Sequence, residues 1–411
     1  MEAVVERFIR YAKQDTTSDP ESKTCPSTDR QLVFMRKLVE ELKDIGLSDV
    51  QLDSFGYVTA TIEANGTAKC PVVGFIAHVD TSPDFPGENV NPVILANYDG
   101  SAVPLANGVT IDPKEFPEIL KYKGQDIITA DGRTLLGADD KAGVAEIVTA
   151  AEIILNSKDM QHGKIRLAFT PDEEVGKGID NFDVKSFGAD FAYTLDGGEI
   201  GELEYENFNA AEAKISIEGR SVHPGEAKDK MINASLVANK LIDMLPPTQR
   251  PEHTEKYEGF YHLMSLKGDV QTAEMYFLIR DHNFEKFQEK KKLMAEVVKQ
   301  INLEYGKEIV TLKMKDEYYN MRQKIEPVMH IIDLAKEAMA VASVEPIVRA
   351  IRGGTDGARL SYEGLPCPNL FTGGHYYHGP YEFIPIRSMV KSVEVILNIA
   401  RLLRAMNCSS G

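Results

Sequence analysis

Residues 72–82 read VVGFIAHVDTS, a short apolar run rich in branched side chains that ends in a histidine and an aspartate. A run of this kind predicts a strand that is buried on both faces of a sheet. Two further apolar runs, Ile165–Phe169 and Phe191–Leu195, also predict strands, and a helical pattern follows Asp140. The alternation predicts an α/β layered domain with a central mixed sheet, whose site lies along the edge where the strands end.

The pattern changes between residues 208 and 315. Strands are expected there at Ala213–Ile217, Glu274–Ile279 and Val310–Met314, and two helical patterns lie between the first and the last of them. We therefore predict a smaller α+β lid domain inserted at 208–315, and a catalytic domain made of residues 1–207 and 316–411. A chain of 411 residues exceeds what one core usually supports, which agrees with two domains.

Composition excludes several classes of function. The net charge of −17 argues against a nucleic-acid partner, because phosphate binding needs a basic surface. No apolar run approaches membrane-spanning length, so no membrane partner is expected. The first residues, MEAVVERFIRYAK, carry acids and bases where a signal peptide needs an apolar stretch. The four cysteines are scattered, which is typical of a reducing compartment. We expect a cytoplasmic protein.

Potential metal ligands stand at the ends of the predicted strands. They are His78, Asp140, Glu174, Asp196 and His378. Two histidines and three carboxylates suit a pair of zinc ions that share one bridging carboxylate. Two more carboxylates stand beside them, one from Asp80 and one from Glu173. A two-metal centre with spare carboxylates is suited to hydrolysis of a peptide or phosphate bond.

Spacing supports some of these ligands and leaves others open. Side chains two residues apart on an extended chain face the same way, so Asp80 can hold the second ring nitrogen of His78. A histidine at a strand end beside a solvated aspartate would give the same pattern. Asp139 could be only the cap of the following helix, with Asp140 turned toward the metals. His375, three residues before the last ligand, is a competing candidate that spacing does not exclude.

The segment PDEE at 171–174 places two acids side by side after a predicted strand. Neighbouring side chains diverge, so one of Glu173 and Glu174 can bind metal while the other faces the reacting water. A solvated acidic turn would look similar, but the preceding strand and the following Gly176 and Gly178 argue against it.

Three further residues are unremarkable alone. His223 in SVHPG reads as a loop histidine, and Arg280 in FLIRD and Arg352 in IRGGTDG read as surface arginines. The glycines around Arg352 indicate a loop that approaches either a ligand or another strand closely.

Taken together, the motifs resemble a known family over essentially the whole chain. They are HVDTSPD, TLLGADDKAG, FTPDEEVGKG, LDGGEIGELEYENFNAA, VHPG, YEGFYHL, IRD, IRGGTDG and GLPCPNLFTGG. The chain closely resembles the tripeptide aminopeptidases of the peptidase T branch of the two-zinc exopeptidase clan. One departure is GGHYYHGPYEF, where His375 and Pro380 are additional to the family pattern.

The resemblance implies a complete set of metal ligands. His78 and Asp196 would hold one zinc ion, and Glu174 and His378 the other. Asp140 would bridge the two ions, and a cis peptide bond would follow it, between Asp140 and Lys141. The Tyr-His-Gly context favours His378 over its neighbour three residues earlier, because that position is not a ligand in the family.

The resemblance also implies roles for the remaining residues. Asp80 would orient the first histidine ligand, and Glu173 would be the general base. The residues that would contact substrate are His223, Asn233, Arg280 and Arg352. In such proteins the lid domain could pair two subunits, which would make this chain a homodimer and let His223 act on the partner's site.

The sequence therefore predicts a metal-dependent aminopeptidase that removes the N-terminal residue of small peptide substrates, namely tripeptides, with two zinc ions per subunit. One rival is a dipeptidase or N-deacylase of the same clan, which would share the metals but not the pocket. A second rival is a metal-binding protein without catalysis. Asp80 and Glu173 argue against the second rival, because neither is needed merely to hold zinc.

Overall fold

The computed structural model describes residues 2–66 and 70–408, which form two compact units. The first unit consists of Met1–Tyr205, Gln323–Arg349 and Thr355–Gly411, and the second of Glu206–Arg322 and Ala350–Gly354. The predicted fold class, an α/β catalytic domain with an inserted α+β lid domain, is confirmed. None of the described helices is long and apolar enough to cross a membrane.

A mixed sheet forms the centre of the first unit, with the strand order β1-β2-β8-β3-β9-β16-β10-β15. The strands are β1 (Ser48–Leu52), β2 (Val58–Ile62), β3 (Val73–His78), β8 (Ile165–Thr170), β9 (Phe191–Gly197), β10 (Glu202–Asn207), β15 (Ile347–Ile351) and β16 (Asn369–Phe371). The central strand β3 pairs in parallel with both β8 and β9, and all six of its residues are buried. Parallel pairing brings the carboxyl ends of these three strands to one edge.

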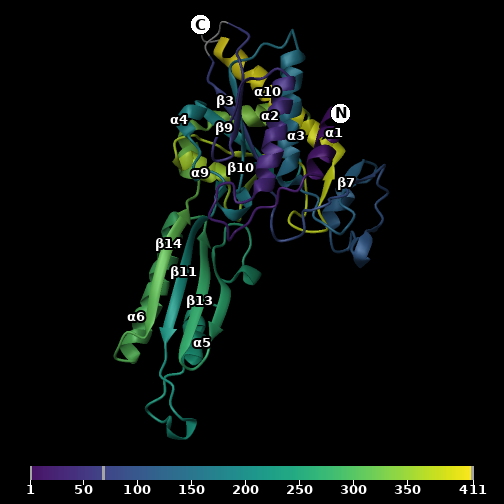
Figure 1. Ribbon diagram of the computed structural model, residues 1–411. Coiled ribbons are helices and arrows are strands. Elements are labelled where there is room, and N and C mark those ends of the chain that lie inside the picture. Colours follow the sequence, from purple (N-terminus) through teal and green to yellow (C-terminus); the bar gives the residue numbers. More distant parts are fainter. Residues whose placement is uncertain (1, 67–69, 409–411) are drawn as a thin grey trace. The chain divides into compact units, whose positions relative to one another are not determined.

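Helices cover both faces of this sheet (Figure 1). They are α1 (Glu2–Ala12), α2 (Asp29–Asp44), α3 (Ala138–Asn156), α4 (Val184–Phe187), α8 (His330–Val341), α9 (Asp356–Tyr362) and α10 (Ile386–Cys408). Helix α3 packs on β3 and against α1 and α10, and all of its residues from Asp140 to Ala151 are buried, as expected of a helix enclosed by its neighbours. On the opposite face, Phe187 of α4 and Leu360 of α9 pack with Ile76 of β3.

A small lobe of the first unit was not anticipated from the sequence. It contains the sheet β17-β7-β4, formed by Phe383–Pro385, Ile127–Thr129 and Val93–Leu95, and the short pair β5 (Val103–Pro104) and β6 (Thr110–Ile111). Tyr122 and Phe383 lie in its apolar cluster. Strand β17 directly follows the loop that carries His378, so this lobe anchors the end of that loop.

The second unit is a four-stranded antiparallel sheet, β12-β13-β11-β14, with two helices on one face. Its elements are β11 (Asn209–Glu218), β12 (Phe260–Gly268), β13 (Thr272–Asp281), β14 (Val310–Tyr318), α5 (Ala234–Met244) and α6 (Phe284–Glu304). Alternate residues of β11, including Ile215 and Ile217, are buried against α5 and α6. This alternation is why the sequence indicated strands here.

The second unit extends beyond the expected range 208–315. Strand β14 continues to Tyr318, and the segment Ala350–Gly354 also belongs to this unit. Arg352, which was expected in the catalytic domain, therefore belongs to the second unit. The physical reason is local, because the Arg352 guanidinium lies over the rings of Phe208 and Phe260 and donates to the carbonyls of Lys256 and Glu258.

Candidate metal centre and active site

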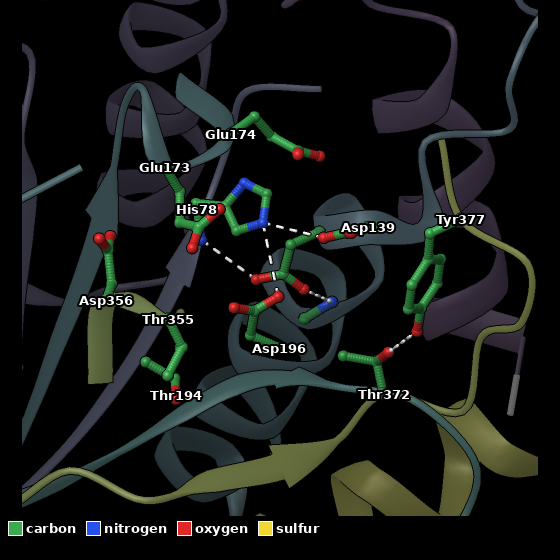
Figure 2. A network of polar contacts seen from close by, with 12 residues as sticks. His78, Asp139, Glu173, Glu174, Thr194, Asp196, Thr355, Asp356, Thr372 and Tyr377 are labelled. Carbon is green, nitrogen blue, oxygen red and sulfur yellow. Dashed lines mark hydrogen bonds and ion pairs between the residues drawn. The ribbon is translucent and has the colours of Figure 1, made fainter. Parts of the chain in front are cut away.

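Acidic and histidine side chains converge at the edge where β3, β8 and β9 end (Figure 2). His78 is the last residue of β3, and Asp196 lies near the end of β9. The acids Glu173 and Glu174 begin the short 3-10 helix η3 (Glu173–Val175) just after β8. The parallel order of the three strands is what brings these separate segments together.

One ring nitrogen of His78 faces the cluster, and the other faces Asp80. Its Nε2 atom lies 2.9 Å from Oδ1 of Asp139 and 3.5 Å from Oδ1 of Asp196. Its Nδ1 atom lies 3.1 Å from the backbone carbonyl oxygen of Asp80 and 3.3 Å from Oδ1 of the same residue. A histidine ligand needs its second nitrogen held in this way, so the placement of Asp80 suits the orienting role expected of it.

Asp139 lies between the two histidines. Its Oδ1 atom faces His78, and its Oδ2 atom lies 3.2 Å from Nε2 of His378. The same Nε2 atom of His378 lies 3.0 Å from Oε2 of Glu174. One carboxylate with an oxygen toward each histidine has the arrangement required of a group shared by two metal ions.

The contacts of Asp140 differ from those expected of a ligand shared by both histidine sites. The Asp140 carboxylate also has an oxygen near the ligand atoms of His78 and Asp196. However, it accepts hydrogen bonds from the backbone N–H groups of His78 at 3.1 Å and Gly143 at 3.2 Å. It is fully buried and is not the group between the histidines. The cis peptide bond is likewise Asp139–Asp140, rather than the expected Asp140–Lys141.

The two adjacent glutamates are fixed through their backbone. Oδ1 of Asp80 accepts the N–H of Glu173 at 3.0 Å, and Oδ2 accepts the N–H of Glu174 at 3.1 Å. One residue before Glu173, the Asp172 carboxylate accepts hydrogen bonds from the backbone N–H and hydroxyl of Ser27 and from the side-chain amide of Gln31. The turn that carries both glutamates is therefore held from two sides, by the end of β3 and by the start of α2.

The residues present fit a divalent metal. Burial, the larger cause, and repulsion from Asp139 raise the pKa of Glu174 to about 8. Burial, and to a smaller extent the charge of Asp196, raise the pKa of Glu173 well above its usual range. Among the described residues, no hydrogen-bond partner reaches the buried Oε1 atom of Glu174. A cation among these carboxylates would offset the cost of burying them together, and imidazole with carboxylate donors suits zinc.

His375 lies outside this cluster. Its ring is stacked on Phe383, and its Nε2 atom lies 2.7 Å from the Tyr122 hydroxyl. Burial lowers its pKa to about 4, so it is a neutral structural histidine. His375 and Phe383 also exchange backbone hydrogen bonds, which close the loop that carries His378.

The four expected substrate-binding residues all belong to the second unit. His223 is exposed, and its Nδ1 atom accepts the N–H of Gly225. Asn233 caps α5 by accepting the N–H of Leu236. Arg280 donates to two backbone carbonyls and pairs with Glu317 at 3.0 Å. The guanidinium of Arg352 is held by the 254–258 segment.

Comparison with known proteins decides the family. A peptidase T from Clostridium botulinum (strain Langeland) is 58% identical over 404 residues, which cover 98% of this chain and 99% of that protein. The chain belongs to the peptidase T family. The expected recognition is thereby confirmed, and a profile of the peptidase dimerisation domain matches residues 205–307.

Solved structures share the fold of this peptidase T family member at low sequence identity. A tripeptidase from Staphylococcus aureus has a TM-score of 0.79 at 20% identity and covers 98% of each chain. A dinuclear metal-binding peptidase of the M20 family from Bacillus subtilis has a TM-score of 0.66 at 15% identity, again with 98% coverage of each chain.

The roles of two residues of this family member could not be assigned from sequence, namely Asp139 between the histidines and Glu382 beneath it. Asp139 was set aside as a simple helix cap, yet the N-cap of α3 is Gly137, and no side chain at that position makes a capping bond. The cap comes instead from Glu382, whose carboxylate accepts hydrogen bonds from the start of α3. The only signal in the sequence was a glutamate four residues after His378, which local spacing cannot connect to α3.

Proposed function

We propose that this chain removes the N-terminal residue from tripeptides with the aid of two zinc ions. The expected enzyme class, a metal-dependent aminopeptidase, is confirmed by membership of the peptidase T family. The observation that carries the proposal is Asp139 between His78 and His378, with Glu173 and Glu174 fixed beside them. The names of the Staphylococcus aureus tripeptidase and the dinuclear Bacillus subtilis peptidase support it.

The proposed ligand set follows from the donors that face one another. His78 and Asp196 would hold one zinc ion, Glu174 and His378 the other, and Asp139 would be shared between them. Bound there, the ions would polarise the scissile carbonyl and lower the pKa of the attacking water. Asp80 keeps the His78 ring in the orientation that presents Nε2 to this centre.

Glu173 is the proposed general base. It sits next to a ligand, and its backbone is pinned by Asp80. Its carboxylate would accept a proton from the attacking water and return it to the leaving amine.

Tripeptide hydrolysis provides the direct test. We expect release of the free N-terminal amino acid from a tripeptide, loss of that activity with a chelator, and recovery on adding zinc. A tripeptide with an acetylated amino group is the matched control and should resist cleavage, because an aminopeptidase acts next to a free amine. Faster hydrolysis of dipeptides or N-acyl amino acids would instead favour the related dipeptidase or deacylase.

The second unit would supply the substrate contacts through His223, Asn233, Arg280 and Arg352. His223 is the exposed member of this set, which suits a side chain that donates to the charge developing on the scissile carbonyl. We propose that it does so in a homodimer paired through the second unit. The match of the peptidase dimerisation domain to residues 205–307 supports this pairing.

Mixing two inactive variants tests the homodimer proposal. His223→Ala and Glu173→Ala lie in different units, so a mixed dimer in which His223 acts on its partner has one complete site. Random exchange makes roughly half of the dimers mixed, so roughly a quarter of the wild-type activity should return. Mass measurement of the mixture verifies exchange. Exchange without recovered activity would mean that His223 serves its own chain.

A further inference from the structure

Glu382 makes an unusual set of contacts next to the metal centre. It is 1% exposed and directly precedes β17. Its Oε2 atom accepts the backbone N–H groups of Leu136 at 2.6 Å and Gly137 at 2.9 Å. Its Oε1 atom accepts those of Ala138 at 2.7 Å and Asp139 at 3.2 Å. One carboxylate thus binds four consecutive amides, and the last belongs to the residue between the two histidines.

The backbone of this segment is shaped to bind an anion. The first N–H groups of a helix lack partners within the helix, and here Glu382 takes those that precede and begin α3. Gly137 has a φ of 74°, a conformation that glycine adopts readily. Alternation between left-handed and ordinary backbone turns successive N–H groups toward one point and makes a small anion-binding concavity. Glu382 occupies that concavity from a distant part of the chain.

The same contact joins two loops that carry proposed ligands. His378 lies four residues before Glu382, on the loop closed by the backbone hydrogen bonds between His375 and Phe383. Asp139 lies at the end of the segment whose amides Glu382 binds. The Glu382 carboxylate therefore ties the backbone of the Asp139 segment to the base of the His378 loop.

We propose that Glu382 is a positioning residue that sets the separation of Asp139 and His378, and so the affinity of the centre for its metals. The inference rests on the proposed two-metal function. Glu382 does not face the cluster itself, because both of its oxygens are used by backbone amides. It acts through the segment 136–139, as residues that hold metal ligands do in other sites.

Glu382→Gln tests this role with little change in shape. The amide offers one acceptor oxygen, and its NH₂ group would face N–H donors, so about half of the contacts to segment 136–139 are lost. We expect the zinc dissociation constant, measured by calorimetry on chelator-treated protein, to rise by roughly 10–100-fold. Glu382→Asp keeps the charge on a shorter side chain and should lie between wild type and Glu382→Gln. Unchanged zinc binding by Glu382→Gln would overturn the proposal.

Glu146→Gln is the matched control. Glu146 is a fully buried carboxyl on α3 that accepts a hydrogen bond from Ser392 of α10 and none from the amides of segment 136–139. The control should bind zinc as wild type does, while both variants should lower the unfolding temperature of the metal-free protein. If Glu146→Gln weakened zinc binding as much as Glu382→Gln, the effect would come from disturbing the core, and the positioning role would be rejected.

Amide exchange in the wild-type protein gives a test that needs no variant. In metal-free protein, the amides of residues 136–139 should exchange as slowly as those of 144–150 in the interior of α3. Fast exchange would show that Glu382 does not hold them, even if Glu382→Gln failed to fold.

Zinc affinity and tripeptide hydrolysis are separate readouts. A protein that bound zinc in a Glu382-dependent way without cleaving tripeptides would overturn the proposed function alone.

Discussion

Glu173→Gln should lose most of its turnover while keeping its metals. The glutamine cannot accept a proton from water, and loss of a general base costs ~10²–10⁴-fold in kcat. Its backbone N–H still donates to Asp80, so the turn that carries it should be preserved. Measured kcat together with zinc content by elemental analysis gives the result.

Glu174→Gln is the internal comparison, because the neighbouring residue has the same size and the same support from Asp80. Its Oε2 atom lies 3.0 Å from Nε2 of His378, so this variant should lose metal as well as activity. A Glu173→Gln protein that loses zinc, beside an active Glu174→Gln protein, would reverse the two assignments.

Asp139→Asn should impair metal binding far more than Asp140→Asn. The Asp139 oxygens face His78 and His378, whereas those of Asp140 accept backbone hydrogen bonds. Removing a shared ligand should weaken zinc binding by more than the ~10–100-fold typical of losing a residue that only supports a ligand. Titration calorimetry of the two metal-free variants compares them directly. A larger loss of zinc affinity in Asp140→Asn than in Asp139→Asn would identify Asp140 as the shared ligand instead.

The strands that end in the site were predictable from local pattern. The runs that became β3, β8 and β9 are apolar and short, and each is followed by residues with metal-binding chemistry. Parallel order then fixes which ends meet, so His78, Glu174 and Asp196 could be expected together. The alternating apolar residues of the inserted sheet were likewise visible, because one face of that sheet packs on helices.

What local pattern could not decide was the choice between Asp139 and Asp140. They are chemically identical neighbours, and the one that faces the histidines is held by a carboxylate far away in the chain. The membership of Arg352 in the second unit has a similar cause, since it depends on the rings of Phe208 and Phe260. Both differences from expectation arose where long-range contacts, rather than periodicity, set the outcome.

The hydrogen bonds that the Asp172 carboxylate accepts from Ser27 and Gln31 matter for protein engineering. Every proposed ligand lies after residue 77, so a shortened chain that starts beyond α2 would keep the whole set. Such a chain would nevertheless lack the partners that brace the turn carrying both glutamates. The amino-terminal helices are therefore poor places for truncation or for a circular permutation break, and fusion partners are better joined ahead of α1.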